Sequence, residues 1–69
     1  MRVDVQRLIG KIYEQGFNKT SFADELDISR ETLRSYVRNP GNIPYDVIVR
    51  MNAALKLSPD EARDIFFAN

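Results

Sequence analysis

The feature that most limits the fold of this chain is the stretch Phe22–Leu33, FADELDISRETL, where two short helical patterns meet with almost nothing between them. Phe22, Ala23 and Leu26 stand at i, i+1 and i+4 and form one apolar face of a short helix. Ser29 is a favoured N-cap residue, and it begins the next helical pattern. The stretch therefore predicts a helix, a tight turn and a second helix.

The other patterns along the chain are also helical, and no segment alternates with period two. Asp4 and Asn18 are predicted to cap the first and second helices. Gly16 is expected to end the first helix, because glycine adopts the left-handed C′ conformation most easily. Pro44 suits the first turn of a fourth helix, and Ser58–Glu61 has the pattern of a capping box for a fifth.

The sequence thus predicts an all-α fold of five helices in one domain over residues 1–69, with helix two at about 19–26 and helix three at about 30–38. Residues 39–44, NPGNIP, are expected to form a loop. The helical period places these apolar residues inward: Leu8, Ile9, Ile12, Tyr13, Phe22, Ala23, Leu26, Ile28, Leu33, Tyr36, Val37, Val47, Ile48, Met51, Ala54, Leu55, Ala62, Ile65 and Phe66.

Composition excludes several classes of protein. There is no cysteine and no histidine, so disulfides, a zinc site built from these residues and a nucleophile–histidine pair are all excluded. The three glycines are scattered, so there is no glycine-rich phosphate loop, and we expect neither enzyme activity nor a cofactor. No apolar run approaches the length of a membrane span, and the polar N-terminus does not resemble a signal peptide. We therefore expect a cytoplasmic protein without a metal.

Positive charge is concentrated in the middle of a chain that is neutral overall. Lys and Arg total 10, and Asp and Glu total 10. Residues 30–50 carry four arginines against two acidic residues, whereas the segments on either side carry a small acidic excess. Arg30, Arg34 and Arg38 follow one another at four-residue spacing along the third helix. A local basic surface of this kind is what meets phosphate groups.

The stretch also resembles the helix-turn-helix of the phage repressor and Cro family, also called the xenobiotic-response-element type. The family's usual run is a polar cap, Gln, two variable residues, then Leu-Ala-x-x-Leu-Gly-Val-Ser; here Asn18 and Lys19 are followed, after two residues, by FADELDIS. Asp27 replaces the family's Gly at the turn, where positive φ is needed, and Asp tolerates that region better than most residues. The resemblance covers the whole chain and implies a five-helix, lambda-repressor-like DNA-binding domain.

The resemblance also implies which residues contact DNA. The family's base-reading positions correspond to Arg30, Glu31 and Ser35, with Arg34 beside them. Arg bonds guanine O6 and N7 together, Glu accepts from cytosine N4, and Ser serves either kind of contact. The expected phosphate contacts, which position the domain without reading sequence, are Lys19, Ser29, Arg38, Asn42 and Tyr45.

Each of these residues also has a simpler interpretation. The three arginines could form a solvated helix face, and Glu31 could be an acidic residue favoured by the helix dipole. Tyr36 should pack its ring, while its hydroxyl faces either solvent or a phosphate. Tyr45 could pack or contact the DNA backbone, and Asn42 could be only a loop residue.

The C-terminal sequence IFFAN suggests a partner surface. Phe66 and Phe67 are adjacent, so one helix cannot bury both on one face. Family members commonly dimerise through this end, so we expect a homodimer with Phe66 and Phe67 at its interface, while a monomer in which Phe67 folds back on the first helix is the alternative.

The expected function is therefore that of a phage or bacterial Cro-like transcriptional repressor that binds double-stranded DNA at an operator. The rival is a small protein-interaction module, an antirepressor or an inhibitor of a host factor, on the same fold. Neutral net charge, the aromatic C-terminus and four acidic residues in or beside the motif (Asp24, Glu25, Asp27 and Glu31) suit that rival. A continuous positive surface from Lys19 to Arg38 would favour DNA, and an apolar groove without one would favour a protein partner.

Overall fold

A computed structural model describes residues 2–68, which form a small bundle of helices about one core. The helices are α1 (Val5–Glu14), α2 (Lys19–Glu25), α3 (Arg30–Arg38), α4 (Tyr45–Leu55) and α5 (Pro59–Phe66), and a short 3₁₀ turn, η1 (Pro40–Asn42), lies between α3 and α4. None of the described residues forms a strand. The all-α fold with five helices predicted from the sequence is confirmed.

The predicted caps are present at four of the five helices. Asp4, Asn18, Ser29 and Ser58 each accept a hydrogen bond from a backbone N–H in the first turn of the helix that follows. α4 differs, because the residue before it is Pro44, which lies at the N-cap position and has no side chain that can cap. The first N–H groups of α4 therefore have no partner within the helix.

The turn between α2 and α3 has the backbone conformation that the sequence predicts. Asp27 lies in the left-handed region with φ +58°. Its N–H donates to the carbonyl of Asp24, and the N–H of Ile28 donates to that of Ala23, which is a Schellman arrangement. Gly16 (φ +87°) ends α1 in the same way, and so does Lys56 (φ +53°) after α4. The left-handed Lys56 has no signal in the sequence.

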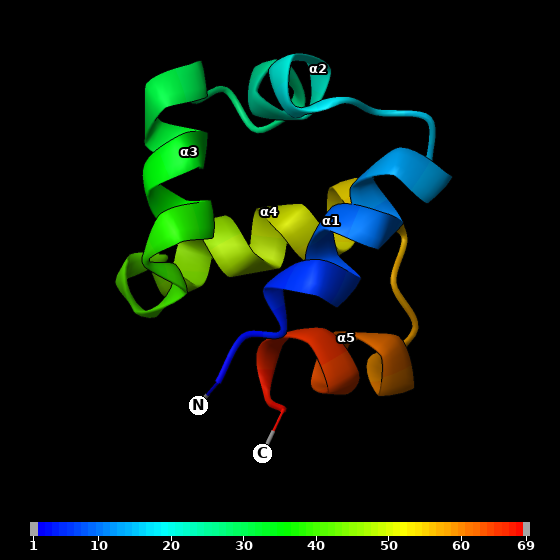
Figure 1. The fold of residues 1–69 in the computed structure, drawn as a ribbon. Helices are drawn as coiled ribbons and strands as arrows, with labels where there is room; N and C mark the ends of the chain where they lie inside the picture. Colours follow the sequence, from blue (N-terminus) through cyan, green and yellow to red (C-terminus); the bar gives the residue numbers. More distant parts are fainter. Residues whose placement is uncertain (1, 69) are drawn as a thin grey trace.

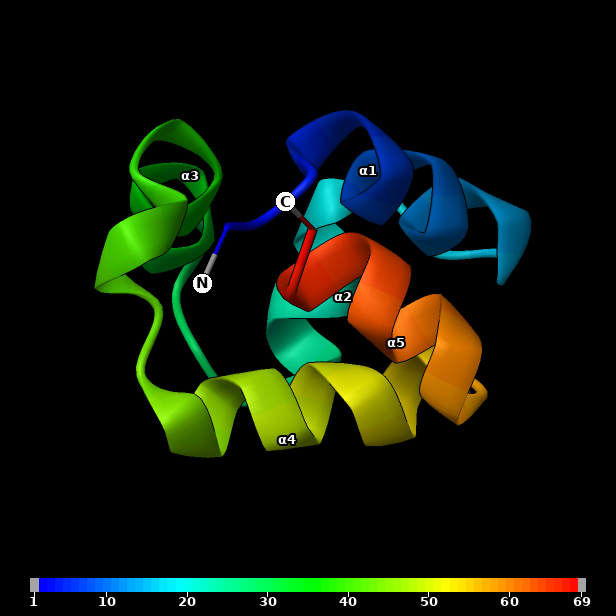
Figure 2. The same cartoon turned by 90° about the horizontal axis from the view of Figure 1, so that it is seen from below.

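Figure 1 shows α2 and α3 meeting at one side of the molecule, with α1, α4 and α5 forming the rest of the bundle. In the view from below (Figure 2), α1 and α3 lie along one side and α4 along the opposite side. The core between the helices is formed by Leu8, Ile12, Phe22, Ala23, Leu26, Leu33, Ile43, Val47, Ile48, Met51, Leu55, Ile65 and Phe66.

Four residues that the helical period places inward lie outside the core. Tyr13 is 55% exposed, so its place in the predicted apolar stripe of α1 is wrong. Ile9, Val37 and Ala62 are half-buried and do not belong to the core. The helical period identifies the apolar side of a helix, but it does not show how much of that side another helix covers. Ile43, in the predicted loop, is buried instead.

Candidate nucleic-acid interface

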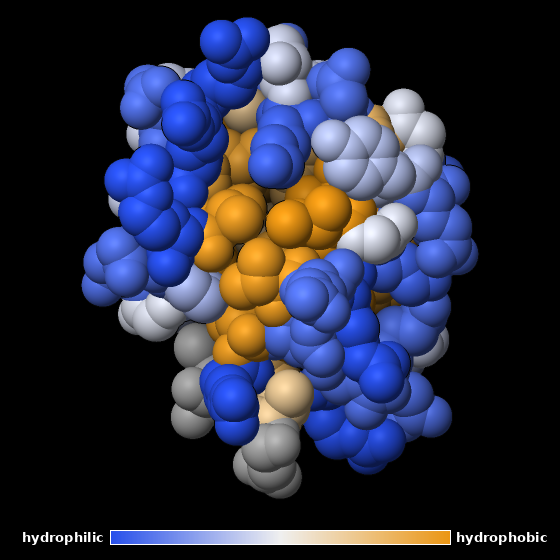
Figure 3. All heavy atoms as spheres, in the orientation of Figure 1, coloured by the Kyte–Doolittle hydropathy of each residue, from blue (hydrophilic) through white to orange (hydrophobic). Residues whose placement is uncertain are grey.

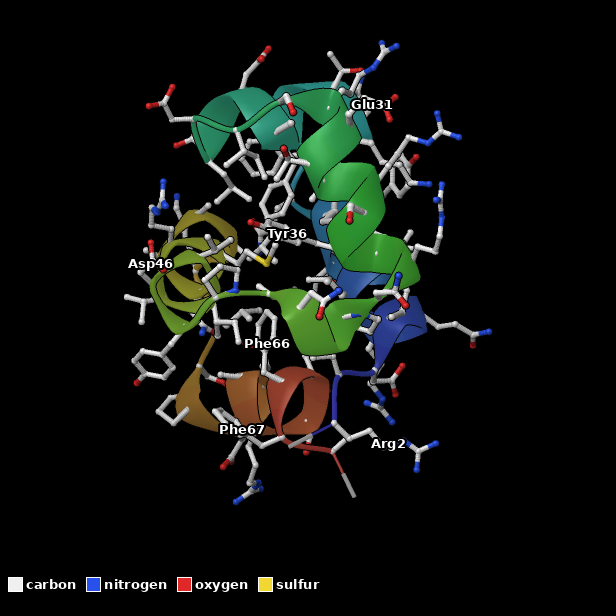
Figure 4. The ribbon with its side chains drawn as sticks, turned by 90° about the vertical axis from the view of Figure 1, so that its left-hand side faces the viewer. Arg2, Glu31, Tyr36, Asp46, Phe66 and Phe67 are labelled. Atoms are coloured by element: carbon white, nitrogen blue, oxygen red, sulfur yellow. The ribbon has the colours of Figure 1, made fainter. Side chains whose placement is uncertain are left out.

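α3 presents its polar side to solvent at the edge of the bundle. Leu33 is 1% exposed and anchors the helix, and Tyr36 packs partly against the core. Figure 4 shows Tyr36 pointing from α3 toward α4, while Glu31 lies at the solvent side of the first turn of α3. Five of the nine positions of α3 are exposed, and they include all four predicted base-reading residues, Arg30, Glu31, Arg34 and Ser35.

The start of α2 lies close to the start of α3. Arg30 Nη1 lies 3.5 Å from Thr20 Oγ1, a long contact that joins the first turns of the two helices. Lys19 precedes Thr20 and is exposed. Arg30, Arg34 and Arg38 then continue along α3 at four-residue spacing, each about 40° from the next around the helix. We call Lys19, Arg30, Arg34 and Arg38 the basic edge.

Most of the basic edge is free of ion pairs. Lys19, Arg30 and Arg38 form none with any described residue. Arg34 lies 3.6 Å from Glu31, but the two side chains are 62% and 85% exposed. Ion pairs this exposed contribute little stability, so either partner is easily released.

The basic residues of α1 and α5 behave differently, because each of them has an acidic partner. Lys11 on α1 forms ion pairs with Glu14 and with Glu61 on α5. The hydrogen bond from Lys11, followed by those within the Ser58 cap, lowers the pKa of Glu61 to about 2, and the bonds to Glu61 and Glu14 raise the pKa of Lys11. Arg7 and Arg63 are paired with Asp4 and Asp60.

Arg50 has a structural role that the sequence did not indicate. Its Nη1 donates to the backbone carbonyl of Leu26, 2.9 Å away, and its Nη2 donates to Asp46. Leu26 follows the last residue of α2, where carbonyl groups lack partners within the helix. Arg50 therefore fixes the end of α2 against α4 and holds the helix-turn-helix in place.

The predicted phosphate contacts lie at both ends of α3. Ser29 caps α3, with Oγ accepting from the N–H of Thr32 at 3.0 Å and sharing a bond with Thr32 Oγ1. Asn42 is exposed at the far end, and its N–H closes the η1 turn by donating to Asn39. Tyr45 opens the uncapped α4 and is 72% exposed, so its ring does not pack.

The predicted dimer residues lie apart from this surface, at the C-terminal end of α5 (Figure 4). Phe66 is 0% exposed and closes the core, so it offers no surface to a partner. Phe67 is 45% exposed and lies beside two backbone bonds that join the chain ends, Asp4 N–H to Ile65 O and Ala68 N–H to Arg2 O. Of the two phenylalanines, only Phe67 is available for contact.

The described residues contain no group of three or more His, Cys, Asp or Glu side chains arranged to hold a metal. Within residues 2–68, no helix has both the length and the apolar character needed to cross a membrane.

The residues that form this surface lie within a segment that matches a known protein family. A family model described as helix-turn-helix matches residues 11–61, which include all of α2, the turn, α3 and α4. A comparison with curated proteins gives no match. The family match confirms the resemblance inferred from the sequence. The chain belongs to the Cro/C1-type helix-turn-helix family of DNA-binding transcription regulators.

Proposed function

We propose that this protein binds double-stranded DNA at a specific operator, as a Cro-like repressor of a phage or bacterium. It would act where the DNA is, in the cytoplasm. The observation that carries the proposal is the basic edge: three of its four cations lack an acidic partner among the described residues, and all four flank or lie on the exposed face of α3. A local patch of unpaired cations suits a polyanion even when the whole chain is neutral.

Base reading is assigned to Arg30, Glu31, Arg34 and Ser35. The N-terminal residues of a recognition helix reach base edges in the major groove, and Arg30 and Glu31 occupy the first turn of α3. Glu31 and Arg34 are exposed enough to exchange their weak mutual ion pair for contacts to cytosine and guanine.

Phosphate contacts are assigned to Lys19, Ser29, Arg38, Asn42 and Tyr45. The uncapped start of α4 supports this part of the proposal, because its free N–H groups and the exposed Tyr45 lie just beyond Asn42 and η1. Free N–H groups at a helix start are suited to phosphate oxygens. The hydroxyl of Ser29 already caps α3, so any phosphate contact there is additional to its structural role.

A homodimer is proposed through Phe67 at the end of α5. The described residues extend over 28 × 23 × 20 Å. Two copies of this size side by side can place their α3 helices about 34 Å apart, which is one turn of DNA. Because the chain has no surplus of positive charge, we expect weak non-specific binding and affinity that depends on base contacts and on dimerisation.

The test is selection from a random double-stranded DNA pool, followed by titration of the best duplex at two salt concentrations. We expect a palindromic motif with half-sites about 10 base pairs apart. Lys19→Ala should weaken binding to all sequences about equally and reduce the salt slope by about 1. Recovery of no sequence by folded protein would overturn the proposal.

A second candidate function, a protein-interaction module, is favoured by a different observation. Figure 3 shows a contiguous apolar area on the face of the molecule where α1 lies in front, beside the hydrophilic column formed by α3. Surface of this kind commonly marks a site where another protein binds. The positive surface that favours DNA and the apolar surface that favours a protein are thus both present, side by side.

A further inference from the structure

Part of the apolar area comes from side chains of α1 that no other helix of the bundle fully covers. Val5, Ile9 and Tyr13 follow one another at four-residue spacing, and the first two are half-buried while Tyr13 is 55% exposed. Leu8 and Ile12, on the neighbouring side of the helix, fill the core. The apolar side of α1 is therefore wider than the bundle can cover.

The charges of α1 lie on its other side. Arg7, Lys11 and Glu14 form the ion pairs with Asp4 and Glu61 that fasten α1 to its own cap and to α5. Between Val5 and Tyr13 the uncovered side carries no charged residue, since a helical period of 3.6 places all three charges about 100° or more away from it. This side of α1 is suited to apolar contact.

α3 contributes one apolar residue at the border of the same area. Tyr36 points toward α4 (Figure 4), whereas Val37 lies on the opposite edge of the inward face, beside Arg30 and Arg34 on the helical wheel. Val37 is half-buried and does not pack against the core. Figures 1 and 2 place α1 and α3 on the same side of the molecule, and Figure 3 shows the apolar surface filling the space between them. We call Val5, Ile9, Tyr13 and Val37 the α1–α3 patch.

Basic side chains border this patch. Arg30 and Arg34 line the α3 border, and neither has a strong acidic partner. Arg2, which Figure 4 shows projecting on the side of the molecule that α1 and the patch occupy, forms no ion pair with a described residue. The carboxylates at the two ends of α1, those of the N-cap Asp4 and of Glu14, are already paired with Arg7 and Lys11. The basic side chains at the border are therefore available to pair with carboxylates of a partner.

We propose that the α1–α3 patch binds an amphipathic acidic helix of a partner protein. The apolar side of that helix covers Val5, Ile9, Tyr13 and Val37, and its carboxylates pair with Arg30 and Arg34. The patch extends about 12 Å along α1, from Val5 to Tyr13, a length that matches two to three turns of a helix in the helix-in-groove mode.

Neither DNA nor a second copy of the chain suits the patch as well. Phosphates cannot hydrogen-bond to valine and isoleucine, and the contact would desolvate them without compensation. A second copy applying the same patch would bring a second row of arginines toward the first.

The proposal has a regulatory consequence that rests on the proposed function. Arg30 and Arg34 are also the residues assigned to base contacts. A partner helix that pairs with them occupies the same guanidinium groups, so the helix and the operator compete for the protein. The patch is then the point at which another protein displaces this one from DNA.

The test uses a fluorescent synthetic peptide of about five helical turns, with leucine at every third or fourth position and glutamate along one side. Its control has lysine in place of each glutamate. We expect the full chain to bind the acidic peptide at least about tenfold more tightly than the basic one, with affinity that falls as salt is added. Equal affinity for both peptides, or no binding of either, overturns the proposal.

A pair of matched variants locates the site. Tyr13→Glu places a carboxylate in the patch at an exposed position, and Val49→Glu does the same on α4, where Val49 is 49% exposed. We expect Tyr13→Glu to weaken peptide binding about tenfold and Val49→Glu to leave it unchanged, with both variants folded by circular dichroism. Equal effects of the two variants would place the peptide elsewhere.

DNA measured in parallel separates this inference from the proposed function. Tyr13→Glu should bind the selected duplex like the parent protein, and unlabelled duplex should displace the acidic peptide from the parent. Peptide binding without any selected DNA sequence would support the proposed patch and contradict the proposed operator binding. A selected DNA sequence with no peptide binding would support the proposed operator binding and contradict the proposed patch.

Discussion

The helix-turn-helix and the α1–α5 pair use charge in opposite ways. α1 and α5 are joined by the Lys11–Glu61 ion pair and by the backbone bond between Asp4 and Ile65, and each of their cations has an acidic partner. In α2 and α3, Lys19, Arg30 and Arg38 have none among the described residues. The cations of the α1–α5 pair are therefore engaged with carboxylates, whereas three cations of the helix-turn-helix are free to meet a ligand.

Apolar packing is what holds the region with free charges in place. Phe22, Ala23, Leu26 and Leu33 are at most 2% exposed, and Phe22 also packs against Phe17 with ring centroids 5.4 Å apart. Arg50 is the exception, because it is the cation that supports the helix-turn-helix from α4. The comparison teaches that in this chain a cation's partners, and not its position near the middle of the sequence, indicate its role.

The largest expected effect is that of Leu33→Ala, which removes the apolar anchor of α3. Truncating a fully buried leucine to alanine costs about 2–5 kcal/mol of stability. A core of this size rarely supplies more than about 3–5 kcal/mol, so the variant should be largely unfolded in urea titrations followed by circular dichroism. Val37→Ala is the matched control. Because Val37 is half-buried outside the core, a loss as large as that of Leu33→Ala would contradict the packing described here.

A smaller effect is expected at the turn between α2 and α3. Asp27→Gly relieves a left-handed backbone at φ +58° and should stabilise the protein by about 0.5–1 kcal/mol. It also removes an acidic residue from the helix-turn-helix, so binding to a selected duplex should tighten at low salt. Lys56→Gly, at φ +53° outside the motif, should raise the urea midpoint similarly without tightening DNA binding. If both variants changed the affinity for DNA equally, the proposed difference in charge between the helix-turn-helix and the rest of the bundle would be contradicted.

The smallest effect concerns the α1–α5 pair and appears only in acid. The pKa of Glu61 is lowered from 4.5 to about 2, chiefly by Lys11, so the unfolded chain takes up the proton first as the pH falls. The stability contributed by Glu61 is fully present above pH 4.5 and is lost as the pH falls through about 2. Glu61→Gln should flatten the dependence of the urea midpoint on pH over this range, and Lys11→Gln should do so too. An unchanged pH dependence in both variants would exclude the pair as its source.

Local rules predicted much of this molecule from sequence. The caps at Asp4, Asn18, Ser29 and Ser58 and the positive φ of Asp27 depend on residues a few positions apart, and all are confirmed.

The features that could not be predicted from the sequence depend on how the helices pack together. Neighbours that are distant in the chain set the exposure of Tyr13, the partial burial of Val37, the burial of Ile43 and the bond from Arg50 to Leu26. For the candidate site, the helical period predicted which side chains of α3 are exposed. It could not show that the cations of α1 and α5 have acidic partners while Lys19, Arg30 and Arg38 of the basic edge have none among the described residues.

The central claim is that free cations on α3, and not paired cations elsewhere, bind DNA. The most direct test measures the dissociation constant of the selected duplex for Arg30→Ala and for Arg63→Ala. Both residues are exposed arginines, but Arg63 lies on α5 and is paired with Asp60. We expect Arg30→Ala to lose about 1–3 kcal/mol of binding, with the fold intact, and Arg63→Ala to bind like the parent. Equal losses in the two variants would mean that DNA responds only to total charge, and would contradict the claim.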